Sequence, residues 1–262
     1  MQSALHEAMT NKLASSDLNI IALLLDVDGT LIEIGSTPSD VHVPPDLLSS
    51  LGRLIQLTGG AVALVSGRPI ADLDRLFSPL RLPAIGGHGA EIRLNGGALQ
   101  RAAEPLPAAL RKLLAAAATP GSGILVEDKG YSLALHYRAA PQDESLIRRH
   151  IAEGIAAFPH EPVEVLPGKA MFEVKRTGVS KGEGVRELMK HPPFQDRKPI
   201  FIGDDVTDES VFALMPVLGG EGFSVGREFR DLAGIFASPS EVRRTLERLA
   251  ESGSAAPVEA RA

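Results

Sequence analysis

The chain has 262 residues, of which 44% are hydrophobic and 23% charged, with a formal net charge of −6 and no cysteine. This composition suits one large or two modest globular domains, and the absence of cysteine excludes disulfides, thiolate metal sites and cysteine nucleophiles. An acidic chain is a poor match for nucleic acid or anionic lipid. The apolar run 20–25 is too short for a membrane span and ends in Asp26. We therefore expect a soluble, cytoplasmic protein with no nucleic acid and no membrane as partners.

Strands and helices are predicted to alternate through the first hundred residues, and we expect residues 1–18 to form a leader before them. The runs 20–25 and 61–65 are continuously apolar, which is typical of parallel strands buried on both faces. Helical spacing follows each of these two runs. Predicted elements of this part are strands at 20–25, 61–65, 83–85 and 90–94, with helices at 44–57 and 70–77.

The pattern changes after residue 104 and returns near residue 178. Two helices and two hairpins between these points predict a small α+β insert with a β-α-β-β-α-β-like order. Its predicted elements are helices at 105–118 and 144–158, with strands at 123–127, 131–137, 163–166 and 170–175. The alternation then resumes with predicted elements at 181–189, 199–202, 209–215, 223–225 and 240–250.

We therefore predict an α/β fold with a doubly wound, mostly parallel sheet core of Rossmann-like type. The core comprises 19–103 and 178–250, an α+β cap occupies 104–177, and 251–262 form a disordered tail. Right-handed crossovers bring the carboxyl ends of parallel strands to one edge, where ligands bind. Three polar clusters follow predicted strands and should meet at that edge; they are 26–30, 66–68 and 203–208.

The first cluster, Asp26-Val27-Asp28-Gly29-Thr30, offers two carboxylates for phosphate chemistry. Side chains two residues apart in an extended chain point to the same side. Asp26, at the strand tip, can attack phosphorus and form a covalent phosphoryl intermediate. Asp28 can donate a proton to the leaving alcohol and then accept one from the hydrolytic water.

A carboxylate that attacks a phosphate needs a cation beside it. At a separation of about 4 Å and an effective dielectric constant near 20, the repulsion from a dianion is roughly 8 kcal/mol. Such a barrier would slow the reaction by about six orders of magnitude. Hard oxygen ligands favour Mg²⁺. We expect its ligands to be the Asp26 carboxylate, the Asp28 backbone carbonyl and Asp204.

Other groups can hold the phosphate itself, namely the Ser66 hydroxyl, the Gly67 amide and the ammonium of Lys181 at a predicted helix start. Each motif taken alone also has a simpler interpretation. The 26–30 cluster alone could be a solvated turn, and Gly203-Asp204-Asp205 alone could be a loop with a helix-capping Asp. Ser66-Gly67 alone could be an ordinary turn, and Lys181 alone the solvated start of a helix. Their common position at strand ends and helix starts favours one shared site.

Taken in order, these motifs resemble those of the haloacid dehalogenase-like superfamily. The matching stretches are DVDGT at 26–30, VSGRP at 65–69, Lys181 and GDDVTDE at 203–209. The resemblance implies that Asp26 is the nucleophile, Asp28 the acid/base and Asp204 a Mg²⁺ ligand, and that Ser66 and Lys181 bind phosphate. It also implies supporting roles for Thr30, Asp205 and Asp208, and a cap like that of the sugar-phosphatase branch.

Longer stretches at 86–93, 126–141, 168–182 and 203–209 resemble the trehalose-phosphatase family. This resemblance implies a small-molecule sugar phosphate, trehalose 6-phosphate, as substrate, and functional coupling to a trehalose-6-phosphate synthase. We also expect the chain to be a monomer. The resemblance implies that substrate-binding residues are Arg68, His88, Glu127, Lys129, His136, Lys169 and Glu173. Carboxylates and lysines can satisfy sugar hydroxyls and penalise a sugar that leaves one of them unpaired.

Several alternatives stay open at this point. Residues 127–129 could be an ordinary hairpin turn and His136 a packing histidine, whereas Tyr137 and Phe172 are predicted to be core residues. The substrate could be another sugar phosphate, of the sucrose-phosphate or mannosylglycerate-phosphate type. The chain could also be a phosphate-accepting signalling module, although the acid/base Asp28 and the cap favour turnover.

Overall fold

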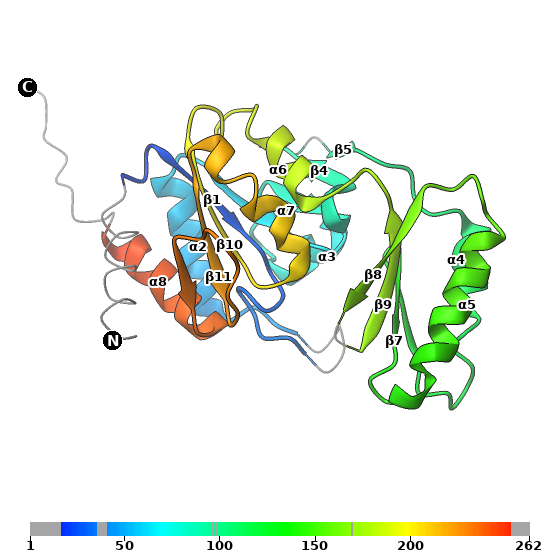
Figure 1. Cartoon of the computed structure of the whole chain (residues 1–262). Coiled ribbons are helices and arrows are strands. Elements are labelled where there is room, and N and C mark those ends of the chain that lie inside the picture. The colour runs from blue at the N-terminus through cyan, green and yellow to red at the C-terminus, as the bar shows by residue number, and fades with distance from the viewer. Residues whose placement is uncertain (1–16, 36–40, 96, 98, 169, 253–262) are drawn as a thin grey trace, which may run out of the picture. The chain divides into compact units, whose positions relative to one another are not determined.

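The computed structural model of the chain (Figure 1) describes residues 17–35, 41–95, 97, 99–168 and 170–252. The chain divides into two compact units. Unit one comprises the described residues up to Gln100 together with those from Ser180 onward, and unit two is Arg101–Val179. Residues 1–16 of the predicted leader and 253–262 of the predicted tail lie outside the described residues.

Unit one is built on a mixed sheet, whose eight strands in the described residues lie in the order β12-β11-β10-β1-β2-β3-β4-β5. The strands from β12 to β3 pair in parallel, and β4 pairs antiparallel with β3. The predicted mostly parallel α/β core is therefore confirmed. The strand bounds are β1 (Ile21–Leu25), β2 (Val62–Val65), β3 (Ala84–Gly86), β4 (Glu91–Arg93), β5 (Leu99–Arg101), β10 (Lys198–Gly203), β11 (Glu221–Val225) and β12 (Gly234–Phe236).

Helices cover both faces of this sheet, as the two apolar runs predict. Alternate residues of β1 point to opposite faces, so Leu23 packs with α2 and α8 whereas Leu24 packs with α6 and α7. Figure 1 shows α2 and α8 side by side on one face. The helix bounds are α2 (Pro45–Leu57), α3 (Ile70–Leu76), α6 (Lys181–Leu188), α7 (Glu209–Phe212) and α8 (Pro239–Ser252), with short 3₁₀ turns at η1 (Gly87–Gly89), η3 (Val206–Asp208) and η4 (Pro216–Leu218).

In its described residues, unit two is a four-stranded antiparallel sheet with two α-helices on one face. Its sheet order is β6-β7-β9-β8. The stacked rings of Tyr137 and Phe172, 5.4 Å apart, lie in its core, as predicted. The bounds are α4 (Ala108–Ala115), β6 (Leu125–Asp128), β7 (Ser132–His136), η2 (Pro141–Asp143), α5 (Glu144–Ala156), β8 (Val163–Gly168) and β9 (Met171–Arg176).

Some element bounds differ from the sequence-based expectation. The first helix of unit two is shorter than predicted because Pro107 forms its N-cap, and α7 ends at Phe212. The strands β5 and β12 are additional. Helix α8 runs through Ser252, so two residues of the predicted tail are helical. The structure contains, among its described helices, none that is long and apolar enough to cross a bilayer.

Candidate active site

The three polar clusters of unit one lie at the same end of adjacent parallel strands. Asp26 follows β1, Ser66 follows β2 and Asp204 follows β10. In the sheet β1 lies between β2 and β10, and the Asp26 amide donates to the Ile202 carbonyl at 2.9 Å. The expectation that these clusters meet at the carboxyl edge of the sheet is therefore confirmed for this part of the chain.

Lys181 provides the cation at this edge. Its ammonium donates to Asp26 Oδ1 and to Asp208 Oδ1, each at 2.7 Å. The three side chains are at least 96% buried. Lys181 is the first residue of α6, whose N-cap Ser180 accepts from the Glu183 amide at 3.1 Å. The capped start of α6 thus fixes the position of the Lys181 Cα and the direction of its side chain.

Asp208 is more central than the sequence indicated. While Oδ1 accepts from Lys181, Oδ2 accepts from the backbone amides of Asp204 and Asp205, at 3.0 Å each. Asp205 is the N-cap of η3 and forms a capping box with Asp208. Asp205 therefore caps a helix, which is the simpler of the two roles that the sequence allowed for it. Asp208 orients both Lys181 and the loop that carries Asp204.

Asp26, Asp204 and Asp208 form an acidic cluster, in which one carboxylate oxygen of each lies within 4.8 Å of the other two. With Lys181 as the nearby cation, two negative charges stay unbalanced when all three carboxylates are ionised. Burial, which outweighs the opposing Lys181 charge, raises the pKa of Asp26 well above its usual range. Burial and the charge of Asp208 raise the pKa of Asp204 to about 6.

The same cluster acts on Lys181 in the opposite sense. Burial by itself lowers the pKa of a lysine, but the charges of Asp208 and Asp26 raise the pKa of Lys181 above its usual range. Lys181 therefore stays positively charged at neutral pH.

Gly29 and Thr30 bring the first acidic loop against Asp204. Gly29 has a φ of +82°, and a Cβ at this position would lie 2.2 Å from Asp204 Oδ2. Only glycine tolerates both the backbone conformation and the close approach. Thr30 Oγ1 donates to Asp204 Oδ1 at 3.3 Å. The DVDGT sequence thus requires its glycine and threonine for the local geometry of the acidic cluster.

Asp28 has a different partner from Asp26. Arg68 Nε donates to Asp28 Oδ2 at 2.6 Å and Arg68 Nη2 donates to Oδ1 at 2.7 Å, a bidentate pair. Ser66 Oγ in turn accepts from the Arg68 amide at 3.1 Å. The resemblance implies that Arg68 binds the substrate. In the structure Arg68 instead forms an ion pair with Asp28. Sequence reasoning did not identify this pair, which joins residues 40 positions apart.

His88 lies behind the Ser66-Gly67 turn. It is 8% exposed and has a left-handed backbone with φ 56°. Its amide donates to the Ser66 carbonyl at 3.1 Å, and a Cβ at Gly67 would lie 2.4 Å from its Nε2. Gly67 therefore allows the histidine ring to pack against the turn. The binding of substrate by His88 stays a prediction.

In unit two the predicted sugar-binding residues gather on the sheet face turned away from α4 and α5. Glu127, Ala134 and Glu173 are side by side across β6, β7 and β9. Lys129 Nζ lies 3.1 Å from Glu173 Oε1 and 3.8 Å from Glu127 Oε2, while His136 Nε2 lies 3.2 Å from Glu127 Oε2.

Ser132 completes this group by donating to Glu173 Oε1 at 2.6 Å. Burial raises the pKa of Glu127, but the hydrogen bond with His136 and the charge of Lys129 outweigh it, so the pKa is lowered. His136 is thus part of a polar network rather than a packing residue. Lys169 lies outside the described residues.

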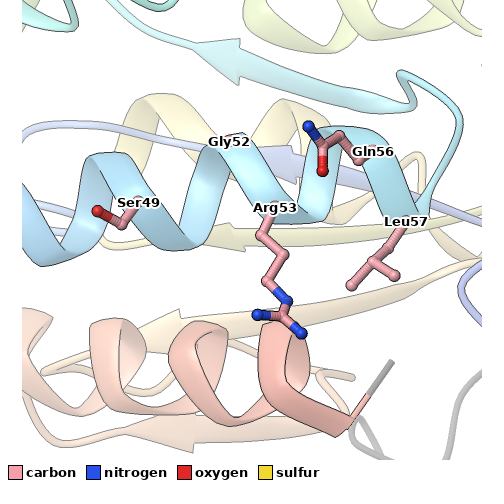
Figure 2. Close-up of a pocket in the computed structure, with 5 residues that line it drawn as sticks. All are labelled: Ser49, Gly52, Arg53, Gln56 and Leu57. Atoms are coloured by element: carbon pink, nitrogen blue, oxygen red, sulfur yellow. The ribbon is translucent and has the colours of Figure 1, made fainter. Parts of the chain in front are cut away.

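A surface pocket of about 530 Å³ lies on α2. Figure 2 shows the five residues that line it, Ser49, Gly52, Arg53, Gln56 and Leu57. The pocket shares no residue with the acidic cluster. Its lining offers one guanidinium but no carboxylate, hydroxyl pair or imidazole that could act together on a substrate. We therefore place the candidate active site at the acidic cluster and not in this pocket.

A family model described as trehalose-phosphatase matches residues 24–230. This chain belongs to the trehalose-phosphatase family. It is 41% identical over 226 residues to a probable trehalose-phosphate phosphatase of Sinorhizobium fredii, covering 86% of this chain and 84% of that protein. It is 39% identical over 235 residues to the trehalose-6-phosphate phosphatase of Escherichia coli K12, covering 87% and 86%.

Structural comparison adds support for the fold. The C-terminal domain of Candida albicans trehalose-6-phosphate phosphatase is similar with a TM-score of 0.79 and 23% identity, covering 94% of this chain and 96% of that domain. The trehalose-phosphatase family resemblance is confirmed. Its membership also confirms the predicted enzyme class, a phosphoric monoester hydrolase, and the fold of the core.

Proposed function

We propose that this chain hydrolyses trehalose 6-phosphate to trehalose and phosphate through an aspartyl-phosphate on Asp26, with Mg²⁺ as cofactor. The observation that carries the proposal is the buried Asp26–Lys181–Asp208 arrangement with Asp204 beside it. A carboxylate held next to a permanent cation at the carboxyl edge of a sheet is suited to attack an anion. The named relatives supply the substrate.

The acidic cluster fits a divalent cation. Its donors are hard carboxylate oxygens, which suit Mg²⁺. One such ion would neutralise the two unbalanced negative charges of the cluster. Asp208 already uses both oxygens for Lys181 and two amides, so Asp26 and Asp204 are the better ligands. When bound, Mg²⁺ would reduce the repulsion between Asp26 and the phosphate.

The residues of unit one would then act as follows. Asp26 attacks phosphorus, the bond to the sugar oxygen breaks, and Asp28 gives that oxygen a proton. Asp28 next takes a proton from water, which attacks the same phosphorus and releases phosphate from Asp26. Ser66 Oγ, the Gly67 amide and Lys181 would hold the phosphate oxygens during both steps. Both oxygens of Asp28 are on Arg68 in this structure, so we expect Arg68 to release one of them.

We propose that unit two sets the substrate specificity as a cap domain. Its polar sheet face combines Glu127, Lys129, Glu173 and His136, which together offer donors and acceptors but little net charge. Sugar hydroxyls are neutral and need partners of both kinds. A sugar that leaves one of these groups unpaired is penalised.

A link to sugar synthesis is part of the same proposal. A relative from Thermoproteus tenax, 31% identical over 204 residues, is a bifunctional trehalose-6-phosphate synthase/phosphatase. In that protein the two activities share one chain. We infer that the present chain consumes the product of a trehalose-6-phosphate synthase.

The test is phosphate release from a panel of sugar phosphates, with and without a chelator. We expect trehalose 6-phosphate to give the highest kcat/KM, and the chelator to abolish turnover until Mg²⁺ is added back. Equal or faster turnover of sucrose, mannosylglycerate or hexose phosphates would refute the substrate. A phosphorylated protein that persists for minutes would instead favour a signalling module.

A further inference from the structure

Arg243 on α8 contacts the segment that follows the acidic motif of β1. Its Nη1 donates to the Leu31 carbonyl at 2.9 Å and to Glu33 Oε2 at 3.1 Å, and its Nη2 donates to Glu33 Oε1 at 2.9 Å. The Arg243 side chain is 20% exposed and that of Glu33 is 64% exposed. One guanidinium thus binds both a backbone carbonyl and a neighbouring carboxylate of the same loop.

The loop that Arg243 holds is tightly folded around the motif. The amides of Leu31 and Ile32 donate to the Val27 carbonyl at 2.9 and 3.1 Å, and the Gly29 amide donates to the Ile32 carbonyl at 2.8 Å. A displacement of Leu31 is therefore transmitted to Gly29 and to its neighbours Asp28 and Thr30. Thr30 in turn contacts Asp204.

The hydrophobic core holds the same two segments together. Val27, Leu31 and Ile32 belong to one apolar cluster with Val242 and Leu246 of α8. This packing fixes the distance between helix and loop but does not orient the loop backbone, because apolar contacts are not directional. The hydrogen bond from Arg243 to the Leu31 carbonyl is directional and supplies that orientation.

We propose that Arg243 is a positioning residue, which orients the 27–32 loop and through it Asp28 and Thr30 for phosphoryl transfer. Glu33 holds the guanidinium in the geometry that reaches the Leu31 carbonyl, and the hydrogen bond from Arg243 lowers the pKa of Glu33. Helix α8 lies beyond the residues that the family model matches, which end at 230. The proposal rests on the phosphatase function proposed above.

The test compares Arg243→Met with Arg243→Lys, Glu33→Ala and, as a control, Arg244→Met. Arg244 is the adjacent exposed arginine of the same helix, so its substitution makes the same charge change. A misplacement near 1 Å can cost about 100-fold in rate. We expect Arg243→Met to lower kcat about tenfold with KM changed less than twofold. Arg243→Lys should recover part of the loss, because its ammonium can still donate to the Leu31 carbonyl.

Glu33→Ala should lower kcat less than threefold, and adding it to Arg243→Met should cause no further loss. Amide hydrogen exchange gives a readout that does not depend on turnover. The Leu31 and Ile32 amides should exchange faster in Arg243→Met than in the wild type, while those of β2 stay unchanged. Arg244→Met should match the wild type in both measurements.

A purely structural role would lower the melting temperature and leave kcat intact at a temperature where the variant is folded. That result, or unchanged exchange at Leu31 and Ile32, would overturn the proposal. If the wild type fails to hydrolyse trehalose 6-phosphate, the substrate proposal fails by itself. The positioning role is then decided by exchange and by hydrolysis of p-nitrophenyl phosphate.

Discussion

Lys181 and Asp208 form an ion pair closed to solvent, with 2.7 Å between Nζ and Oδ1 and side chains 4% and 0% exposed. The pair joins the start of α6 to the end of η3. Removing one partner of a buried pair typically costs about 3–5 kcal/mol, because the other charge stays buried.

Asp208→Asn should reduce both stability and turnover. An asparagine keeps the shape but offers one carbonyl oxygen, so it cannot accept from Lys181 and from the Asp204 and Asp205 amides at once. We expect the midpoint of chemical denaturation to fall and kcat to drop at least 100-fold. Asp205→Asn is the control, since asparagine is also a good N-cap, and it should change both quantities little. Wild-type kcat in Asp208→Asn would show that Lys181 does not need this partner.

Asp26→Asn should abolish turnover while the fold is retained. The substitution removes the attacking charge and keeps the shape of the side chain. It also removes one of the crowded carboxylates, so we expect the melting temperature of the metal-free variant to equal or exceed that of the wild type. Phosphate release and thermal unfolding measure the two effects. More than about a hundredth of the wild-type activity would require attack by water instead.

Mg²⁺ should raise the melting temperature of the wild type by an amount that grows with the logarithm of its concentration above the dissociation constant, because a ligand that binds the folded state stabilises it. Asp204→Asn should remove most of this shift, since it removes one of the two expected carboxylate ligands. Thermal unfolding with chelator and with added Mg²⁺ measures the effect. An equal shift in Asp204→Asn would place the ion elsewhere.

The metal-free protein should lose stability as the pH rises from about 4 to about 6 and above. The pKa of Asp204 is raised from about 4 in an unfolded chain to about 6 in the fold, and that of Asp26 is raised as well. The folded state therefore binds these protons more tightly than the unfolded chain does. The stabilisation that this proton binding gives is complete below pH 4 and is lost as the pH rises through the pKa values of the folded state. The gain from Mg²⁺ should grow over the same range, as followed by thermal unfolding at fixed ionic strength.

Glu173→Gln and Lys129→Met should raise KM for trehalose 6-phosphate at least tenfold and leave the hydrolysis of p-nitrophenyl phosphate within twofold of the wild type. The aryl phosphate has no sugar hydroxyls to bind. The control is Arg111→Met, which removes the 2.7 Å ion pair between Arg111 and Asp128 in the same unit. If both substrates lose activity equally, these residues support the fold of unit two and not sugar binding.

The core of the fold could be predicted because its central strands are continuous runs of apolar residues in the sequence. Strand β1 is fully buried, and Leu47, Leu51 and Leu54 recur at helical spacing on the inner side of α2. Strand β5 could not be predicted, because Leu99–Arg101 is exposed along its whole length. Strand β12 could not be predicted either, because Phe236 alone among its three residues is buried and the strand begins with Gly234, a residue type depleted in strands.

The site could be predicted where an ionisable residue directly follows a predicted strand or begins a predicted helix, as for Asp26, Asp204 and Lys181. The bidentate contact of Arg68 with Asp28 depends on rotamers and on the alignment of β1 with β2, which no local pattern specifies. The position of Asp208 did carry a signal. An acidic residue three positions after the N-cap Asp205 is the spacing of a capping box.

Strand β1 lies between β2, its near neighbour in sequence, and β10, which follows the whole of unit two. Asp26 and Lys181 are 155 residues apart in the chain. On the ribosome, which makes the N-terminal part first, the nucleophile is therefore synthesised long before its cation. A nascent chain carries an incomplete active site, and catalysis can begin only after α6 and β10 have emerged and docked.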